Sequence, residues 1–257
     1  MAEKDSVFNS IPELNYQEGA DEVNLKEFEK VIKSRRSVRV YGKDPVPDAV
    51  VQECLEWALL APNSSNLQPW DFYWVKSDEK KAKLVEYCLG QPAAATAPVL
   101  IVCVARTDTW KQNAREMLEI FKSAPNSPKA VINYYSKLVP FAYNQGPFGL
   151  LGLAKRLILN LAGLKKPTPR EPVSHADMKV WAAKSTALAC ENLMLSFRAH
   201  GFDSCPMEGI DSRRIKKLLK LSKGAFPAMV VSAGKRAPNG IYGPRLRYDS
   251  KRFIHKI

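Results

Sequence analysis

Apolar residues recur at helical spacing after Asn24, which predicts that a helix begins there. Asn24 is a good N-cap, and Glu27 three residues later completes a capping-box pattern. One apolar face of this helix would carry Leu25, Phe28, Val31 and Ile32. Residues 1–23 lack such periodicity, so we expect them to form an N-terminal arm.

The same patterns predict further elements along the chain. Helices are expected from Pro47 to about Leu59, over 80–88, over 176–200 with Gly201 as the stop, and over 211–221 with Asp211 or Ser212 as the cap. Strands are expected over 71–75, 99–104 and 228–233. Helices outnumber strands and no linker divides the chain, which predicts one α+β domain over 1–257. Residues 110–175 fit least well, since prolines interrupt their pattern.

The amino-acid composition limits the range of possible functions only slightly. The chain has 257 residues, of which 46% are hydrophobic and 25% charged, as in ordinary globular proteins. Its net charge of +13 favours anionic partners. The five cysteines include no C-x-x-C pair and the three histidines are scattered, so we expect no metal site and reduced thiols. No signal peptide or long apolar span is evident, and we expect a cytoplasmic protein.

Three short segments carry chemistry that a hydrophobic core does not need. They are Arg35-Arg36-Ser37-Val38-Arg39, Pro62-Asn63-Ser64-Ser65-Asn66-Leu67-Gln68-Pro69-Trp70 and Pro206-Met207-Glu208-Gly209. Arginine forms forked, charge-assisted contacts with phosphate. Taken singly, a basic run is usually a solvated face, and turn amides often only satisfy the backbone.

In this order and at these separations, the three segments resemble motifs of the nitroreductase family of FMN-dependent oxidoreductases. The resemblance covers most of 25–108 and 178–257. It implies a nitroreductase-like fold, with a central mixed, mostly antiparallel sheet surrounded by helices, in an interlocked homodimer. Residues 110–175 would form a lid-like insertion of one or two helices.

The resemblance also implies an FMN site. Arg35 with Arg245 and Arg247 would bind the phosphate, Ser37 the phosphate or ribityl region, and Arg39 the N1 and O2 edge. The 62–70 turn would reach the flavin across the dimer interface, and the backbone N–H groups at the end of the third segment would face N5 and O4. The implied cofactor-binding set is Arg35, Arg36, Ser37, Arg39, Pro62, Asn63, Ser64, Ser65, Asn66, Gln68, Pro206, Met207, Glu208, Gly209, Arg245 and Arg247. No side chain is expected to be catalytic, because flavin N5 carries the hydride.

Within that set, Leu67 departs from a position that is often small or polar in relatives, and we expect only local packing to change. A glycine at 209 would let the main chain approach the flavin closely. Weaker candidates are Gln91, Lys184 and the Lys235-Arg236 turn.

The implied function is FMN-dependent reduction of nitroaromatics, quinones or similar electron-poor acceptors with NADPH or NADH. No G-x-G-x-x-G follows a strand, so the dinucleotide would bind transiently over the flavin in a ping-pong scheme. An alternative is a specialised member that dehalogenates, dehydrogenates or fragments flavin, since 110–175 diverges. A nucleic-acid-binding module rests on charge alone, and we expect no nucleic-acid partner.

Residues 148–164 are apolar, with Lys155 and Arg156 near the centre and Lys165-Lys166 after them. This stretch packs either against the fold or partner subunit, as apolar helical stripes usually do, or weakly against a membrane surface.

Overall fold

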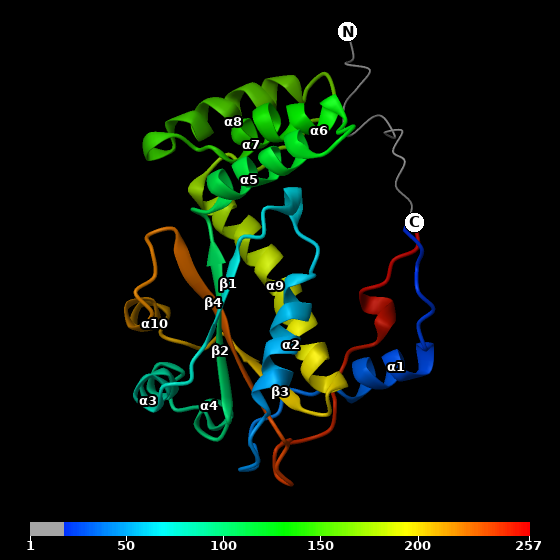
Figure 1. The fold of residues 1–257 in the computed structure, drawn as a ribbon, viewed down its shortest axis with the longest axis vertical. Helices are drawn as coiled ribbons and strands as arrows, with labels where there is room; N and C mark the ends of the chain where they lie inside the picture. The colour runs from blue at the N-terminus through cyan, green and yellow to red at the C-terminus, as the bar shows by residue number, and fades with distance from the viewer. Residues whose placement is uncertain (1–17) are drawn as a thin grey trace.

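A four-stranded sheet forms the centre of the computed structural model, which describes residues 18–257 (Figure 1). The strands are β1 (Trp70–Trp74), β2 (Val99–Arg106), β3 (Asp203–Met207) and β4 (Ala225–Gly234). Their order is β1-β2-β4-β3, and all three pairings are antiparallel. An isolated parallel bridge joins Ser37 to Ser204. The predicted α+β class is confirmed. The first 17 residues of the expected arm lie outside the described residues.

Helices cover both faces of this sheet. α2 (Asp48–Leu59) and α9 (His175–Ala199) pack on one face, and α3 (Asp78–Tyr87), α4 (Pro92–Ala95) and α10 (Ser212–Leu218) on the other. Successive side chains of β2 point to opposite faces, so Ile101 enters the α2/α9 cluster while Leu100 and Val102 enter the other. Burial on both faces explains why β2 is a continuous apolar run rather than an alternating one.

The predicted helix ends are largely confirmed, because capping is local chemistry. α1 spans Leu25–Ser34, and the Asn24 side chain accepts hydrogen bonds from the backbone N–H groups of Lys26 and Glu27 at 3.1 and 3.3 Å. α9 ends before Gly201, whose φ of +76° suits glycine. The apolar face of α1, however, lies exposed on this chain.

The sequence patterns missed β3, because Pro206 lies inside it. Proline lacks the N–H that a central strand needs, but β3 is an edge strand of the four-stranded sheet, with β4 as its neighbouring strand and a single bridge to Ser37 on its other side. The third segment, which the family resemblance presents as a turn over 206–209, is therefore partly strand: Pro206 and Met207 belong to β3, and only Glu208 and Gly209 follow it.

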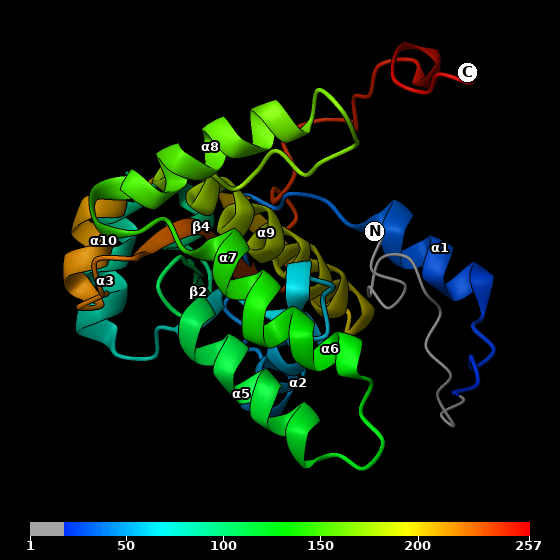
Figure 2. The same ribbon diagram turned by 90° about the horizontal axis from the view of Figure 1, so that it is seen from above.

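The region 110–175 contains more helices than the one or two expected. They are α5 (Trp110–Ser123), α6 (Lys129–Asn133), a π-helical turn η2 (Tyr134–Leu138), α7 (Val139–Tyr143) and α8 (Leu150–Ala162). Pro128 is the N-cap of α6 and Pro140 lies in the first turn of α7, so prolines divide the region into short helices. Figures 1 and 2 show this insertion over one end of the sheet and α9.

Three short 3₁₀ turns complete the described elements: η1 (Ser64–Asn66), η3 (Pro147–Gly149) and η4 (Ser250–Arg252). Within residues 18–257, every helix is too short or too polar to cross a bilayer.

Candidate functional site

The segment Arg35–Arg39 leaves α1 in extended conformation and runs beside edge strand β3. Arg35 ends the helix with ψ of 130°, and the N–H of Val38 donates to the Ser204 carbonyl at 3.1 Å. The N–H of Arg39 donates to the Gly240 carbonyl at 2.7 Å. Because Val38 is fully buried and side chains alternate in an extended segment, Ser37 and Arg39 point away from that core. The first sequence segment therefore lies beside β3, the strand in which the third segment begins.

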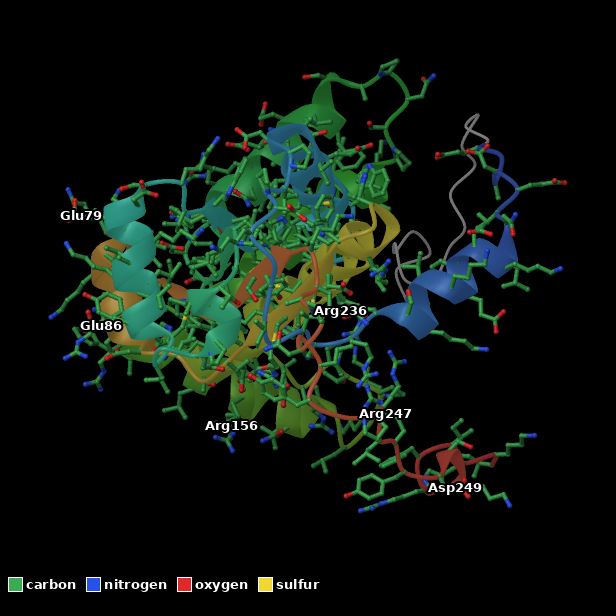
Figure 3. The ribbon with its side chains drawn as sticks, turned by 90° about the horizontal axis from the view of Figure 1, so that it is seen from below. Glu79, Glu86, Arg156, Arg236, Arg247 and Asp249 are labelled. Carbon is green, nitrogen blue, oxygen red and sulfur yellow. The ribbon has the colours of Figure 1, made fainter. Side chains whose placement is uncertain are left out.

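The C-terminal tail returns to the same place. Arg36 Nη2 donates to the Gly243 carbonyl at 2.6 Å, and the guanidinium of Arg245 donates to the Arg35 carbonyl. A hollow of about 740 Å³ lies here, lined by Lys33, Ser34, Arg36, Arg198, Asp203, Arg236 and Arg245. Figure 3 shows Arg236 and Arg247 on the side where the tail leaves the fold. Arg236, one of the weaker candidates, thus belongs to this hollow.

The hollow carries positive charge that the described residues only partly neutralise. Asp203, which is buried, pairs with Arg198 at 3.0 Å and Arg236 at 2.7 Å. No ion pair within residues 18–257 joins Arg36, Arg245 or Arg247 to a carboxylate.

The clustering of guanidinium groups also affects the pKa of Arg245. Desolvation first, and then the charges of Arg247, Arg36 and Arg35, lower the pKa of Arg245. Such a cluster would be stabilised by a phosphate dianion.

The end of β3 is held by the side chain of Gln91. Its Nε2 donates to the carbonyls of Gly209 and Cys88, at 2.9 and 3.0 Å. A Cβ placed on Gly209 would come no closer than 3.7 Å to any described atom, namely Gln91 Nε2. The described residues leave space at this position, so the chain's own packing does not require a glycine.

The turn after α2 is conformationally unusual. Ser65, Asn66 and Gln68 have φ values of +60°, +47° and +44°, a region that few non-glycine residues adopt. The side chain of Asn63 supports the turn, since its Oδ1 accepts from the Gln68 N–H at 2.7 Å. Leu67 is fully buried against the insertion and α9.

Tyrosines of the insertion hold this turn, and sequence reasoning missed them. The Tyr143 hydroxyl lies 2.8 Å from Ser64 Oγ and 3.0 Å from Ser65 Oγ, and the Tyr134 hydroxyl lies 2.7 Å from Ser65 Oγ. The Tyr135 hydroxyl donates to the Ser65 carbonyl at 3.0 Å. The one signal in the sequence was a group of aromatic hydroxyls in a region otherwise read as a lid.

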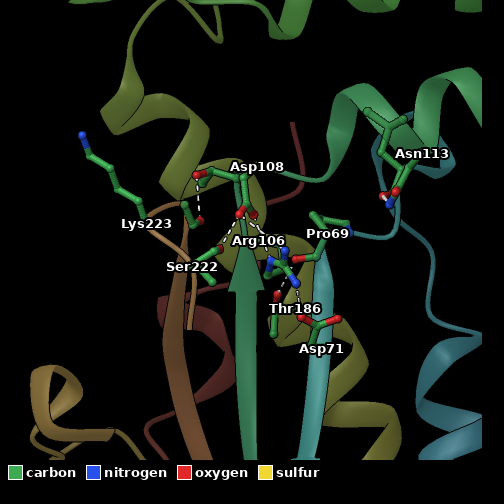
Figure 4. A network of polar contacts seen from close by, with 12 residues as sticks. Pro69, Asp71, Arg106, Asp108, Asn113, Thr186, Ser222 and Lys223 are labelled. Carbon is green, nitrogen blue, oxygen red and sulfur yellow. Dashed lines mark hydrogen bonds and ion pairs between the residues drawn. The ribbon is translucent and has the colours of Figure 1, made fainter. Parts of the chain in front are cut away.

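A second polar network holds the other end of the turn, at Pro69 (Figure 4). The Arg106 guanidinium pairs with Asp71 and, at 2.9 Å, with Asp108, while the Arg106 N–H donates to the Pro69 carbonyl at 2.8 Å. Asn113 of α5 adds a hydrogen bond to the Leu67 carbonyl at 2.8 Å. Together these contacts keep the strained turn in a single position.

The turn borders a cavity of about 540 Å³ between the insertion and α9. Its lining is mostly apolar and aromatic, with hydroxyls at one side, and includes Ser64, Ser65, Phe141, Tyr143, Trp181 and Leu188. Lys184, a weaker candidate for the cofactor site, lines this cavity instead.

One chain therefore does not bring all the predicted residues together. The turn leads into β1 and the arginine segment lies along β3, and these are the two opposite edges of the sheet. In sequence order and in chemistry the residues match one site, but in a single chain they form two half-sites.

Comparison with known proteins identifies the family to which the chain belongs. Residues 32–235 match the model of the nitroreductase family. The chain belongs to the nitroreductase family. The predicted family and the prediction of a nitroreductase-type oxidoreductase are thereby confirmed.

Individual members of the nitroreductase family align over most of the chain. An NADH dehydrogenase of Thermus thermophilus is 30% identical over 215 residues, covering 82% of this chain and 88% of that protein. YdgI of Bacillus subtilis, named as an NAD(P)H nitroreductase, is 30% identical over 233 residues, covering 89% and 97%. A nitroreductase-type structure from Exiguobacterium sibiricum, solved in complex with FMN, superposes with a TM-score of 0.62 at 23% identity, covering 94% and 99%.

Proposed function

We propose that this nitroreductase is an FMN-dependent NAD(P)H oxidoreductase that acts as a homodimer. The observation that carries the proposal is the convergence of Arg35–Arg39, the end of β3 and the Arg245–Arg247 tail at one sheet edge. The described carboxylates neutralise this positive charge only in part: Glu191 pairs with Arg35 at 3.5 Å, and Asp203 pairs with Arg198 and Arg236. The family membership and the FMN complex of a relative support it.

The residues present fit FMN in three respects. Arg36, Arg245 and Arg247 offer guanidinium donors to a phosphate. Arg39, whose backbone N–H is held by the Gly240 carbonyl, places a cation beside the core, suited to the ring edge that gains negative charge on reduction. The space above Gly209 allows a ring to approach the main chain closely. Bound FMN would supply the hydride-accepting centre, and the protein the binding and electrostatics.

The proposal of a homodimer rests on the position of the second half-site, the 62–68 turn. Because the 62–68 turn lies at the opposite sheet edge, it would meet a flavin only if that flavin is held by a second copy. The cavity behind the turn would then receive the electron acceptor, a nitroaromatic, quinone or similar electron-poor compound. NAD(P)H and acceptor would use this space in turn, in a ping-pong scheme. We also infer one domain over 1–257, with residues 110–175 as its lid, and a cytoplasmic location, in keeping with five free, buried cysteines.

The test is the visible spectrum of protein supplemented with FMN, desalted and kept anaerobic, before and after addition of NADPH or NADH. We expect a retained flavin band that bleaches with one of the two. Protein that retains no flavin contradicts the cofactor assignment, and a bound flavin that stays oxidised contradicts the assignment of NAD(P)H as donor. Sedimentation of the same sample tests the dimer.

A specialised reaction is the second candidate, and the tie between turn and insertion favours it. Three tyrosines from the insertion fix the turn that borders the acceptor cavity, so the cavity's shape depends on the chain's most divergent region. Nitroarene and quinone turnover no faster than with free reduced FMN would favour a specialised dehalogenase, dehydrogenase or flavin-fragmenting enzyme.

A further inference from the structure

Helix α8 presents its apolar side to solvent. Its outward residues are more than half exposed and include Leu153, Leu157, Ile158 and Leu161. Phe148, just before the helix, is 98% exposed and is held at a φ of +53°, an uncommon conformation for an aromatic residue. In Figure 2 the helix lies along the margin of the insertion. A contiguous apolar surface of this kind marks an interaction site.

The polar side of α8 faces inward. Lys155 is buried, and its Nζ donates to the carbonyls of Ala142, Phe141 and Pro172, at 2.7, 3.1 and 3.3 Å. One turn earlier, a Cβ on Gly152 would lie 2.4 Å from the Val173 carbonyl oxygen, so only glycine fits there. These contacts prevent the helix from rotating its leucines into the fold. Of the two central cations, Lys155 is therefore buried and Arg156 exposed.

The part of the insertion that contains α8 carries ionisable side chains of one sign only. Between Glu119 and Glu171 the chain has no Asp or Glu and eight cations: Lys122, Lys129, Lys137, Lys155, Arg156, Lys165, Lys166 and Arg170. Lys165 and Lys166 lie three and four residues beyond the last residue of α8, and Arg156 is exposed beside Leu157. Two copies of such a surface would repel each other. A surface of anionic headgroups would attract it.

We propose that α8 and Phe148 bind the surface of an anionic lipid bilayer, with the leucines entering the headgroup boundary and the flanking cations contacting lipid phosphates. Thirteen residues give a helix of roughly 20 Å, long enough to lie in the interface and too short to cross it. The proposal is independent of which acceptor the enzyme reduces.

Co-sedimentation of the FMN-loaded protein with vesicles tests this. The vesicles are pure phosphatidylcholine, or phosphatidylcholine with about 30% phosphatidylglycerol. We expect binding to the anionic vesicles only, weakening as salt is raised. Leu157→Glu should weaken it by about tenfold. Leu89→Glu is the matched control, since Leu89 is 70% exposed against 65% for Leu157 but lies far along the chain, after α3, and it should bind like the wild type.

The proposal is overturned if wild-type protein does not sediment with anionic vesicles, or if Leu157→Glu binds them as well as Leu89→Glu does. Loss of a higher oligomer in Leu157→Glu, without vesicle binding by the wild type, would assign the face to a second copy. Thermal melting shows whether each variant is folded. Leu153→Ser tests the same face with a substitution that introduces no charge.

Discussion

Arg36 and Gly243 are joined by a hydrogen bond of 2.6 Å from the guanidinium Nη2 to the backbone carbonyl, across 207 positions of sequence. In the same region, the Arg245 guanidinium donates a hydrogen bond to the Arg35 carbonyl. The first basic segment and the C-terminal tail therefore support each other, and their charges accumulate at one edge of the sheet.

Arg245→Ala is expected to weaken FMN binding by about 10- to 100-fold, the range for loss of one charge-assisted hydrogen bond. Quenching of flavin fluorescence on titration into apoprotein measures the affinity. The control is Arg213→Ala, an exposed arginine of α10 outside the hollow. Equal affinities of the two variants would remove Arg245 from the phosphate site.

Gly209 and Gly240 differ in the reason why a glycine is needed. At Gly209 we expect the bound ligand to require it, and at Gly240 the fold itself. A Cβ on Gly240 would lie 2.6 Å from the Val40 carbonyl oxygen, whereas Gly209 has open space. Gly209→Ala should keep the free energy of unfolding within about 0.5 kcal/mol while weakening FMN binding. Gly240→Ala should lower the free energy of unfolding by about 1–3 kcal/mol. Urea unfolding of the apoproteins measures both free energies. A Gly209→Ala variant that is clearly less stable than wild type would contradict the ligand role of this glycine.

Tyr143→Phe removes the hydroxyl that contacts Ser64 and Ser65. We expect the free energy of unfolding to fall by about 0.5–1.5 kcal/mol, because hydrogen bonds to the partly buried hydroxyls of the turn are lost. Tyr248→Phe, which removes an exposed hydroxyl, should change it very little. Urea midpoints that match for the two variants would mean that the insertion does not hold the turn.

Lys155→Ala should destabilise the fold by about 2–4 kcal/mol, since three carbonyls lose a charged donor and a buried volume is emptied. Its neighbour provides the control: Arg156 is exposed, and Arg156→Ala should stay within about 0.5 kcal/mol of wild type. The comparison by urea unfolding also tests the orientation of α8. A larger loss for Arg156→Ala would show that the helix is turned the other way.

Acid should weaken the network that holds the turn at Pro69. Burial alone would raise the pKa of Asp108, but hydrogen bonds from Arg106 and Ser222 outweigh it and the pKa is lowered. A lowered carboxyl pKa contributes stability that is present above the unfolded value of about 3.9 and is lost as the pH falls through the folded value.

Asp108→Asn should therefore be less stable than wild type at neutral pH and should lose less stability below about pH 4. Urea midpoints measured over a pH series test this, with exposed Asp21→Asn as control. Parallel pH curves for wild type and Asp108→Asn would exclude this carboxylate as a source of acid sensitivity.

Sequence patterns located most helices and the family motifs, because the determining interactions are local. Asn24 caps α1 through hydrogen bonds two and three residues away, and Gly201 ends α9 by its own backbone freedom. The basic character of Arg35–Arg39 can likewise be read from residue types, and the structure brings this segment together with the tail.

The packing of the insertion, residues 110–175, could not be predicted from local sequence in this way. Its apolar periodicity predicts a helix over 148–164, but which side of that helix faces the protein depends on carbonyls contributed by Phe141, Ala142 and Pro172. Hydropathy alone assigns the leucines to the interior, and the buried hydrogen bonds of Lys155 reverse that assignment.

The sequence by itself determined the family, the helix ends and the chemistry of the basic segment, since each depends on residue identity and short-range contacts. Only the tertiary structure decided that strand β3 accepts Pro206, that insertion tyrosines hold the Ser64–Ser65 turn, and that turn and arginines lie at opposite sheet edges. Those features depend on strand order and on burial, which are set by contacts between residues far apart in the chain.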